Sequence, residues 1–173
     1  MAAVASRDEA ALRWFFDLYH PGVFRYMLCL TANREDAEDL AQDSMLRAAA
    51  QIRSFRGESL LKTWVHRIAY RTFTHWNRKR RRLVELPEEA LMKEGAYDAV
   101  EARLTFLEAL GQMPAQLVHT FVMLEVSGMS VEEIAEAMSI PEGTVKSRLF
   151  AARRRLRTLL QEEVEEKSHA HCP

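Results

Sequence analysis

Apolar residues recur at steps of three and four along most of the chain, which is the spacing of one face of an α-helix. In residues 35–52 this face comprises Ala37, Leu40, Ala41, Met45, Ala48 and Ile52. In residues 60–76 it comprises Leu61, Trp64, Val65, Ile68, Ala69 and Phe73. Asn33 stands where the N-cap of the first helix is expected, and Gly57 indicates a loop between the two.

The N-terminal apolar pattern is interrupted by Pro21 and Gly22. Because proline disrupts helix interiors, we expect one helix at residues 8–19 and a second that begins after this pair. The first half of the chain is then a four-helix unit. No alternating run rich in Val, Ile and Thr lies between turn residues, so no strand is predicted.

The apolar pattern lapses in residues 86–100, "LPEEALMKEGAYDAV", which we interpret as an acidic linker. A second helical unit begins near Glu101 and contains "GMSVEEIAEAMSIPEGTVKSRLFAARRRL". In it, Ser130 and Glu133 form a capping box, and Pro141 opens the next helix, where its missing N–H costs nothing. This pattern predicts a helix-turn-helix. The fold class is therefore all-α, with two small helical domains joined by a linker.

The second helix of this motif has one apolar and one polar face. Val145, Leu149, Ala152 and Leu156 are expected to face the core. This leaves Ser147, Phe150, Ala151 and Arg154 pointing outward, flanked by Lys146, Arg148 and Arg153. Hydroxyl, aromatic and guanidinium groups suit base edges, thymine methyl groups and phosphates in a DNA major groove.

The distribution of charge along the chain is more informative about function than the overall composition. The 173 residues carry a formal net charge of only -1, yet residues 62–82 and 143–160 contain bases and no acid. Two basic blocks separated by an acidic stretch indicate two contacts with a polyanion. The alternative for either block alone is a solvated surface that complements a helix dipole. For Trp64 and Phe73 we favour core packing. Trp76 stands next to the basic run, and core packing and DNA contact are both open for it.

Several classes of protein are disfavoured. There is no signal-peptide pattern and no run of about 18 apolar residues, and two cysteines make a poor disulfide framework, so a soluble cytoplasmic protein is expected. No glycine-rich phosphate loop, metal-ligand spacing or activated nucleophile stands out. We therefore expect no catalytic activity and no cofactor. His169, His171 and Cys172 could bind a metal, but no second cluster accompanies them.

The motifs "DAEDLAQDSMLRA", "FRGESLLKTWVHRIA" and "IPEGTVKSRLFAARRRL", in this order, resemble regions two and four of the extracytoplasmic-function (ECF) group of bacterial RNA polymerase sigma factors. The resemblance implies that the protein binds core polymerase and directs promoter recognition and transcription initiation. It places Asp39, Gln42 and Asp43 on the face that docks on the β′ clamp helices. Without it, a solvated acidic face would be the simpler interpretation of these residues.

The resemblance also implies which residues contact DNA. The loop around Ser59 would capture a flipped base of the minus-ten element, and the basic helix after it would hold the phosphates. The implied minus-ten contacts are Ser59, Lys62, Thr63, Arg67, Arg71, His75, Trp76, Arg78, Lys79, Arg80, Arg81 and Arg82. The implied minus-thirty-five contacts are Thr144, Lys146, Ser147, Arg148, Phe150, Arg153 and Arg154. Many relatives carry asparagine at the position of Arg71, which bears on the base preference of the minus-ten pocket. Relatives also carry arginine at the position of Ala151, so one minus-thirty-five contact is expected to be missing.

We thus expect a region-two domain at residues 1–84, a linker at 85–100, a region-four domain at 101–162 and a polar tail at 163–173. The expected partners are core RNA polymerase (β′ clamp helices and β flap), promoter DNA and an anti-sigma factor. One alternative is an autonomous helix-turn-helix regulator that binds duplex operators as a dimer. Another is a sigma-like decoy that captures an anti-sigma factor, against which the basic blocks argue.

Overall fold

The computed structural model describes residues 8–83 and 99–170. Within these ranges the chain forms α-helices and one 3-10 turn and contains no strand, which confirms the all-α prediction. The elements are α2 (Glu9–Thr31), α3 (Arg34–Gln51), η1 (Ile52–Ser54), α4 (Leu61–Leu83), α5 (Ala99–Gly111), α6 (Ala115–Glu125), α7 (Val131–Met138) and α8 (Glu142–Ala170).

The predicted break at Pro21 is wrong, because α2 runs without interruption from Glu9 to Thr31. An internal proline removes one hydrogen bond, to the carbonyl group four residues earlier, which here belongs to the exposed residue Asp17. Phe15 before the proline and Val23 after it are both fully buried, so packing on both sides maintains the helix. The first unit is therefore built from α2, α3 and α4, and not from four helices.

The predicted apolar faces of α3 and α4 form the core of this unit. Ala37, Leu40, Ala41, Met45, Ala48 and Ile52 are buried, as are Trp64, Val65, Ile68, Ala69 and Phe73, while Leu61 is partly buried against them. Asn33 is the N-cap of α3, and its Oδ1 accepts a hydrogen bond from the N–H of Asp36 at 3.0 Å. The helical period was therefore a correct guide to burial.

The helix-turn-helix is formed by α7 and α8. The capping box is present, since the Glu133 N–H donates to Ser130 Oγ and the Ser130 N–H donates to Glu133 Oε2. Ser139 ends α7 in the left-handed conformation, with φ at 56°. Pro141 precedes α8 by one residue, and its carbonyl oxygen accepts from Thr144 and Val145. Residues 163–170 of the expected tail continue α8.

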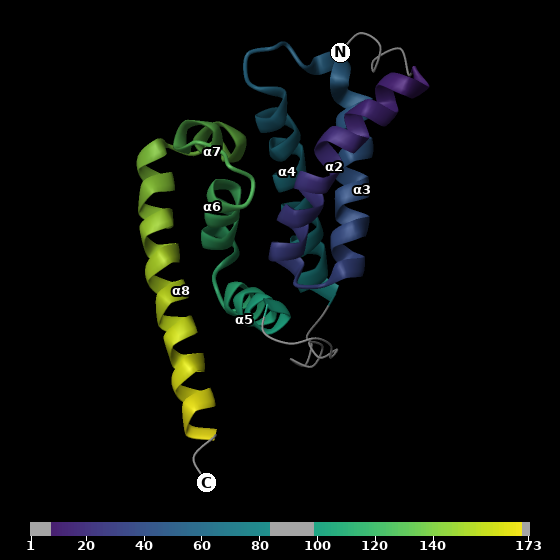
Figure 1. The fold of residues 1–173 in the computed structure, drawn as a ribbon. Coiled ribbons are helices and arrows are strands. Elements are labelled where there is room, and N and C mark those ends of the chain that lie inside the picture. Colours follow the sequence, from purple (N-terminus) through teal and green to yellow (C-terminus); the bar gives the residue numbers. More distant parts are fainter. Residues whose placement is uncertain (1–7, 84–98, 171–173) are drawn as a thin grey trace.

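The two units lie against each other (Figure 1). Helix α7 contacts α4, and α5 and α6 contact α2, while α8 packs on α5, α6 and α7. The outer surface of α8 therefore faces away from the α2–α4 bundle. This arrangement places the first turns of α4 at the interface between the units and the basic block of α8 on the outside.

Candidate nucleic-acid interface

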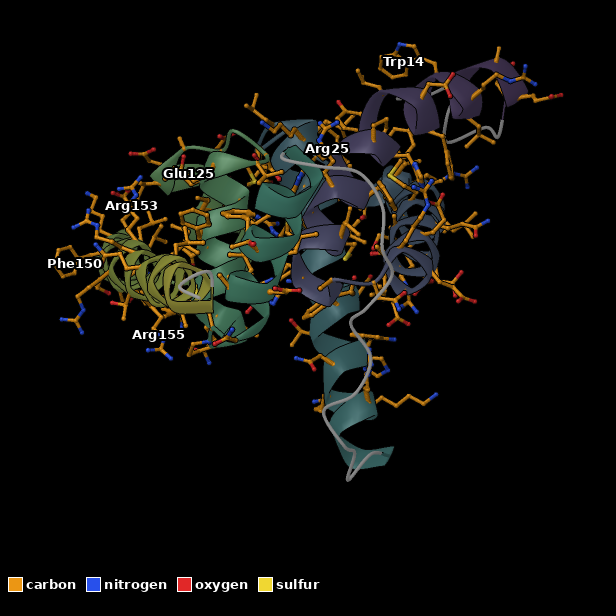
Figure 2. The ribbon with its side chains drawn as sticks, turned by 60° about the horizontal axis from the view of Figure 1, so that its bottom comes forward. Trp14, Arg25, Glu125, Phe150, Arg153 and Arg155 are labelled. Carbon is orange, nitrogen blue, oxygen red and sulfur yellow. The ribbon has the colours of Figure 1, made fainter. Side chains whose placement is uncertain are left out.

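The outer face of α8 presents the residues expected to read DNA. Phe150 is 71% exposed and projects away from the rest of the molecule (Figure 2). Ser147 and Arg154 are exposed beside it, and Ala151 is partly buried. The opposite face of the helix is buried, as the sequence predicted, so the buried side fixes the direction in which Phe150 points.

The flanking side chains of α8 have partners within the second unit. An Arg153 guanidinium N–H donates to Glu125 of α6 at 2.8 Å, and Arg148 donates to the Gln116 side chain at 3.2 Å. Lys146 Nζ lies 3.5 Å from Glu142. Thr144 is partly buried in the first turn. Exposed ion pairs of this kind contribute about 0.2–1 kcal/mol, so they restrain these cations only weakly.

The C-terminal half of α4 carries the other basic surface. Arg71, His75, Arg78 and Lys79 are exposed along it. Arg80 donates to Asp36 of α3 at 2.9 Å, and its guanidinium carbon lies 5.0 Å from the centre of the partly buried Trp76 ring. Arg81 and Arg82 belong to the last turn of α4, and their side chains lie outside the description.

The first turns of α4 are engaged with the helix-turn-helix. Lys62 Nζ donates to the carbonyl oxygen of Gly128 at 3.0 Å. Thr63 is fully buried, and its hydroxyl donates to Glu133 Oε1 at 2.9 Å. Arg67 forms an ion pair with Glu136. Ser59, in the preceding loop, is partly buried. Three of the expected minus-ten residues thus contact the second unit.

Two buried histidines lie near this contact, and the sequence analysis singled out neither. His119 of α6 is hydrogen-bonded to Tyr26, and its ring meets Tyr70 and Phe73 edge-on at 4.9 and 5.0 Å between centres. Burial, and secondarily the charge of Arg148, lowers the pKa of His119 to about 3. Burial likewise lowers the pKa of His66. A histidine within the apolar segment "QLVHTFVML" was the available signal.

The residues expected to dock on polymerase share one side of α3. Asp39 and Gln42 are exposed, and Asp43 accepts from the exposed side chain of Arg47 at 2.8 Å. Leu46 continues the same row of positions and is 55% exposed. The spacing of three and four residues, applied to the polar side of the helix, would have identified Leu46 as a member of this face.

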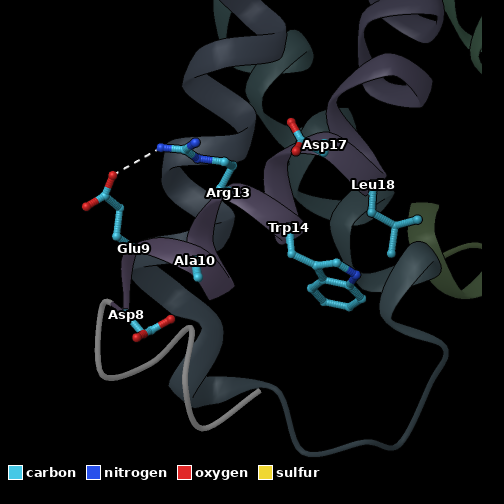
Figure 3. A pocket seen from close by; sticks show the side chains of 7 residues that line it. All are labelled: Asp8, Glu9, Ala10, Arg13, Trp14, Asp17 and Leu18. Atoms are coloured by element: carbon cyan, nitrogen blue, oxygen red, sulfur yellow. Dashed lines mark hydrogen bonds and ion pairs between the residues drawn. The ribbon is translucent and has the colours of Figure 1, made fainter.

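A second exposed apolar pair lies at the start of α2. Trp14 and Leu18 are each 53% exposed and point to the same side of α2 (Figure 3). Figure 2 shows Trp14 on the part of this helix that projects from the molecule. The two side chains line a shallow depression together with Asp8, Glu9, Ala10, Arg13 and Asp17. Arg13 is paired with Glu9 at 3.1 Å. No motif or apolar periodicity in the sequence pointed to this surface.

No group of three His, Cys, Asp or Glu side chains in residues 8–83 and 99–170 is arranged to hold a metal ion. Of the expected metal candidates, His169 lies in α8 with its side chain outside the description, and His171 and Cys172 lie outside the described residues. Within the same ranges, no helix has the length and hydrophobicity needed to cross a bilayer. The fold is that of a two-domain helical protein with a helix-turn-helix.

Comparison with known proteins identifies the family. Residues 15–83 match sigma-70 region 2, and residues 103–156 match sigma-70 region 4. The chain is 31% identical to the ECF RNA polymerase sigma-E factor of Haemophilus influenzae, with 78% of this chain and 80% of that protein covered. It is 34% identical to the ECF sigma factor EcfG of Rhodopseudomonas palustris, with coverage of 81% and 80%.

A solved complex of the sigma factor RpoE with the anti-sigma factor NepR, from Bartonella quintana, contains a similar fold. The TM-score is 0.73 at 30% identity, and the match covers 86% of this chain and 96% of that chain. The chain belongs to the sigma-70 family of RNA polymerase sigma factors, in its ECF group. It is an alternative sigma factor that directs transcription initiation at promoters, and the reading as an autonomous regulator is not favoured. Sigma factors are DNA-binding initiation factors without catalysis of their own.

Proposed function

We propose that the two units divide promoter recognition between them, α2–α4 binding the minus-ten element and α5–α8 the minus-thirty-five element. The exposure of Phe150, together with Ser147 and Arg154, on the outer face of α8 is the observation that carries this division. An exposed aromatic ring can contact thymine methyl groups in a major groove. The flanking Lys146 and Arg153 would then exchange their weak internal ion pairs for phosphates or base edges.

On α4, the exposed row Arg71, His75, Arg78 and Lys79 supports phosphate contact beside the melted strand. Single-stranded DNA is held by cations along its backbone and by stacking of bases on aromatic rings. Trp76 can supply such stacking, because Arg80 lies over its ring in the free protein and could move to a phosphate. Ser59 and Thr63 remain our candidates for the flipped-base pocket.

For the polymerase, the proposed docking face consists of Asp39, Gln42, Asp43 and Leu46 on α3. The carboxylates can pair with arginines on a partner helix, and the half-exposed leucine adds apolar area at the same place. Leu46 is the new member of this set.

An anti-sigma factor is a further proposed partner, because the similar RpoE structure was solved in complex with one. We also propose that the protein acts in the cytoplasm, where core polymerase and promoter DNA are found, and that it catalyses no reaction itself. The domain limits proposed from the helices are α2–α4 for the first domain and α5–α8 for the second.

The test compares the purified protein with its holoenzyme on one promoter fragment at physiological salt. The protein alone should bind the duplex weakly and without strand opening. Core polymerase should add specific binding and permanganate-reactive thymines near the minus-ten element. Tight binding to a palindromic site by the protein alone, unchanged by core polymerase, would instead support an autonomous regulator.

A further inference from the structure

One side of α2 carries an exposed row of side chains. Trp14, Leu18, Pro21 and Arg25 follow one another at steps of three and four residues, and all four are exposed. The other sides of α2 contact α3, α4, α5 and α6. Among the described elements, none covers this row. The surface therefore lies open to solvent although its first two members are large and apolar.

Small residues lie one helical turn before and one turn after the apolar pair. Ala10 precedes Trp14 by four residues, and Gly22 follows Leu18 by four. Ala10 is exposed, and a Cβ added at Gly22 would have nothing within 4 Å. The distance between two packed helices depends on the side chains at their contact, so small residues here allow another helix to approach closely.

This order of residues is complementary to its own reverse. In an antiparallel pair of α2 helices with a two-fold axis beside Phe16, positions equally far before and after Phe16 face each other. Trp14 then faces the partner's Leu18, and Ala10 faces the partner's Gly22. The partner in this case is a second copy of the chain. Each large side chain thus meets a large apolar one, and each small residue meets a small one, which makes the contact self-complementary.

The charges beside the row show the same complementarity. Arg13 and Asp17 border the depression that Trp14 and Leu18 line (Figure 3). An antiparallel two-fold places the same flank of both helices together, so Arg13 lies within about 3 Å, along the helix axis, of the partner's Asp17. The ion pair of Arg13 with Glu9 is highly exposed and therefore weak enough to be exchanged.

A second charge match lies toward the ends of the contact. The same two-fold brings Arg25 to the start of the partner's helix, where Asp8 lies as the N-cap. Asp17 and Arg25 form no ion pair with another described residue, so both charges are available. A parallel copy would instead place Trp14 on Trp14 and leave these charges without opposite partners. The charges therefore select the antiparallel arrangement.

We propose that the row from Ala10 to Arg25 is a dimer interface, at which two copies of the protein pair antiparallel through α2. A different protein with one sign of charge would be repelled either by the arginines or by the aspartates of this surface, whereas a second copy meets each with its opposite. The contact is one helix wide, and stable interfaces bury about 1,200–2,000 Å² in total. We therefore expect a weak dimer, with a dissociation constant on the order of 10–100 µM.

The first test is sedimentation equilibrium of the full-length protein from about 1 to 300 µM. The average mass should rise from that of one chain toward twice that value. Trp14→Ala should weaken the dimer at least about tenfold, because buried tryptophans dominate interface energetics. Leu60→Ala is the matched control, since it removes another exposed apolar side chain, 65% exposed, outside α2, and it should dimerise as the wild type does.

The second test uses two charge variants that complement each other. Arg13→Glu and Asp17→Lys should each dimerise less than the wild type, because every copy then presents like charges to its partner. A mixture of the two should dimerise more than either variant alone, since Glu at position 13 of one faces Lys at position 17 of the other, and the unchanged Asp17 and Arg13 face each other. Circular dichroism verifies that both variants are folded.

Three results would overturn the proposal. A wild type that stays monomeric throughout the concentration range shows that the row binds no second copy, and that Trp14 serves a contact with a different protein. Dimerisation that Trp14→Ala leaves unchanged places the interface on another surface. Absence of any gain on mixing Arg13→Glu with Asp17→Lys rules out the antiparallel pairing of α2.

Discussion

The hydroxyl oxygen of Tyr26 lies 2.6 Å from Nδ1 of His119, and both side chains are buried where α2 meets α6. The pKa of His119 is lowered to about 3, chiefly by burial, so its ring is neutral at physiological pH. The neutral imidazole of His119 therefore contributes a hydrogen bond and aromatic packing to the contact between the two domains. Protonation would place a positive charge among aromatic rings and near Arg148.

We expect acid to weaken the folded protein. A histidine with a pKa near 6.5 in the unfolded chain and about 3 in the folded chain takes up its proton preferentially on unfolding. The free energy of unfolding should therefore be level above about pH 7 and fall below pH 6.5, by roughly 1.4 kcal/mol per pH unit for one proton. His66 acts in the same direction, while Tyr26 stays protonated because burial raises its pKa. Tyr70 also faces the His119 ring.

Urea unfolding between pH 7.5 and 5 measures this slope above the range in which most carboxylates titrate. His119→Gln should show a shallower slope than the wild type, because one of the two buried histidines with a lowered pKa is then absent. Equal slopes in the two proteins would contradict the assignment to His119.

Charge reversal on α3 tests the polymerase face. Asp39→Lys with Asp43→Lys should abolish binding to core polymerase, since two carboxylates offered to a partner become cations. Stability should change by less than about 0.5–1 kcal/mol, because both sites are at least partly exposed and only the weak ion pair with Arg47 is lost. Pull-down with core polymerase and a thermal melt provide the two readings. Glu9→Lys, which also breaks an (i, i+4) pair, is the control and should bind normally.

Removal of the Phe150 ring should separate DNA reading from folding. Phe150→Ala should alter stability by less than about 0.5 kcal/mol, because the ring is 71% exposed, yet weaken promoters that depend on the minus-thirty-five element. Leu149→Ala, one residue away and buried, should instead lower the free energy of unfolding by about 2–5 kcal/mol. Normal use of those promoters by Phe150→Ala would show that the ring does not read DNA.

The two basic surfaces should differ in sequence dependence. Arg153→Ala should weaken promoters selectively, by about 1–3 kcal/mol if the guanidinium reads a base. Replacement of Arg80, Arg81 and Arg82 by alanine should weaken all promoters alike and flatten the dependence of binding on salt. Affinities of both variants on two promoters at several salt concentrations provide the comparison. Identical discrimination by the two would refute the proposed division.

The helices and their caps could be predicted because residues close together in the sequence determine them. The capping box of Ser130 and Glu133 and the buried row from Val145 to Leu156 follow from spacing within one or two helical turns. Pro21 misled for the same reason, since a local rule against proline was outweighed by packing of Phe15 and Val23 on either side. A rule about one residue does not show how the residues around it pack in the folded protein.

The contact between the domains could not be predicted in this way. Tyr26 and His119 are 93 positions apart, and Arg67 and Glu136 are 69 apart. Hydrophobic periodicity does not reveal either pair, because each contact depends on how α6 and α7 pack against α2 and α4. Lys62 and Arg67 belong to a basic block that was predicted to bind a polyanion. In this structure they bind oxygen atoms of Gly128 and Glu136 in the same chain.

Glu133 uses its two carboxylate oxygens for different purposes. Oε2 accepts from the N–H of Ser130 at the start of α7, and Oε1 accepts from the Thr63 hydroxyl on α4. A substitution at Glu133 would therefore remove a hydrogen bond between the two domains and also remove the capping box at the start of α7. Among related sequences, position 133 should therefore vary less than position 136, because one substitution at Glu133 removes two contacts that serve different parts of the fold.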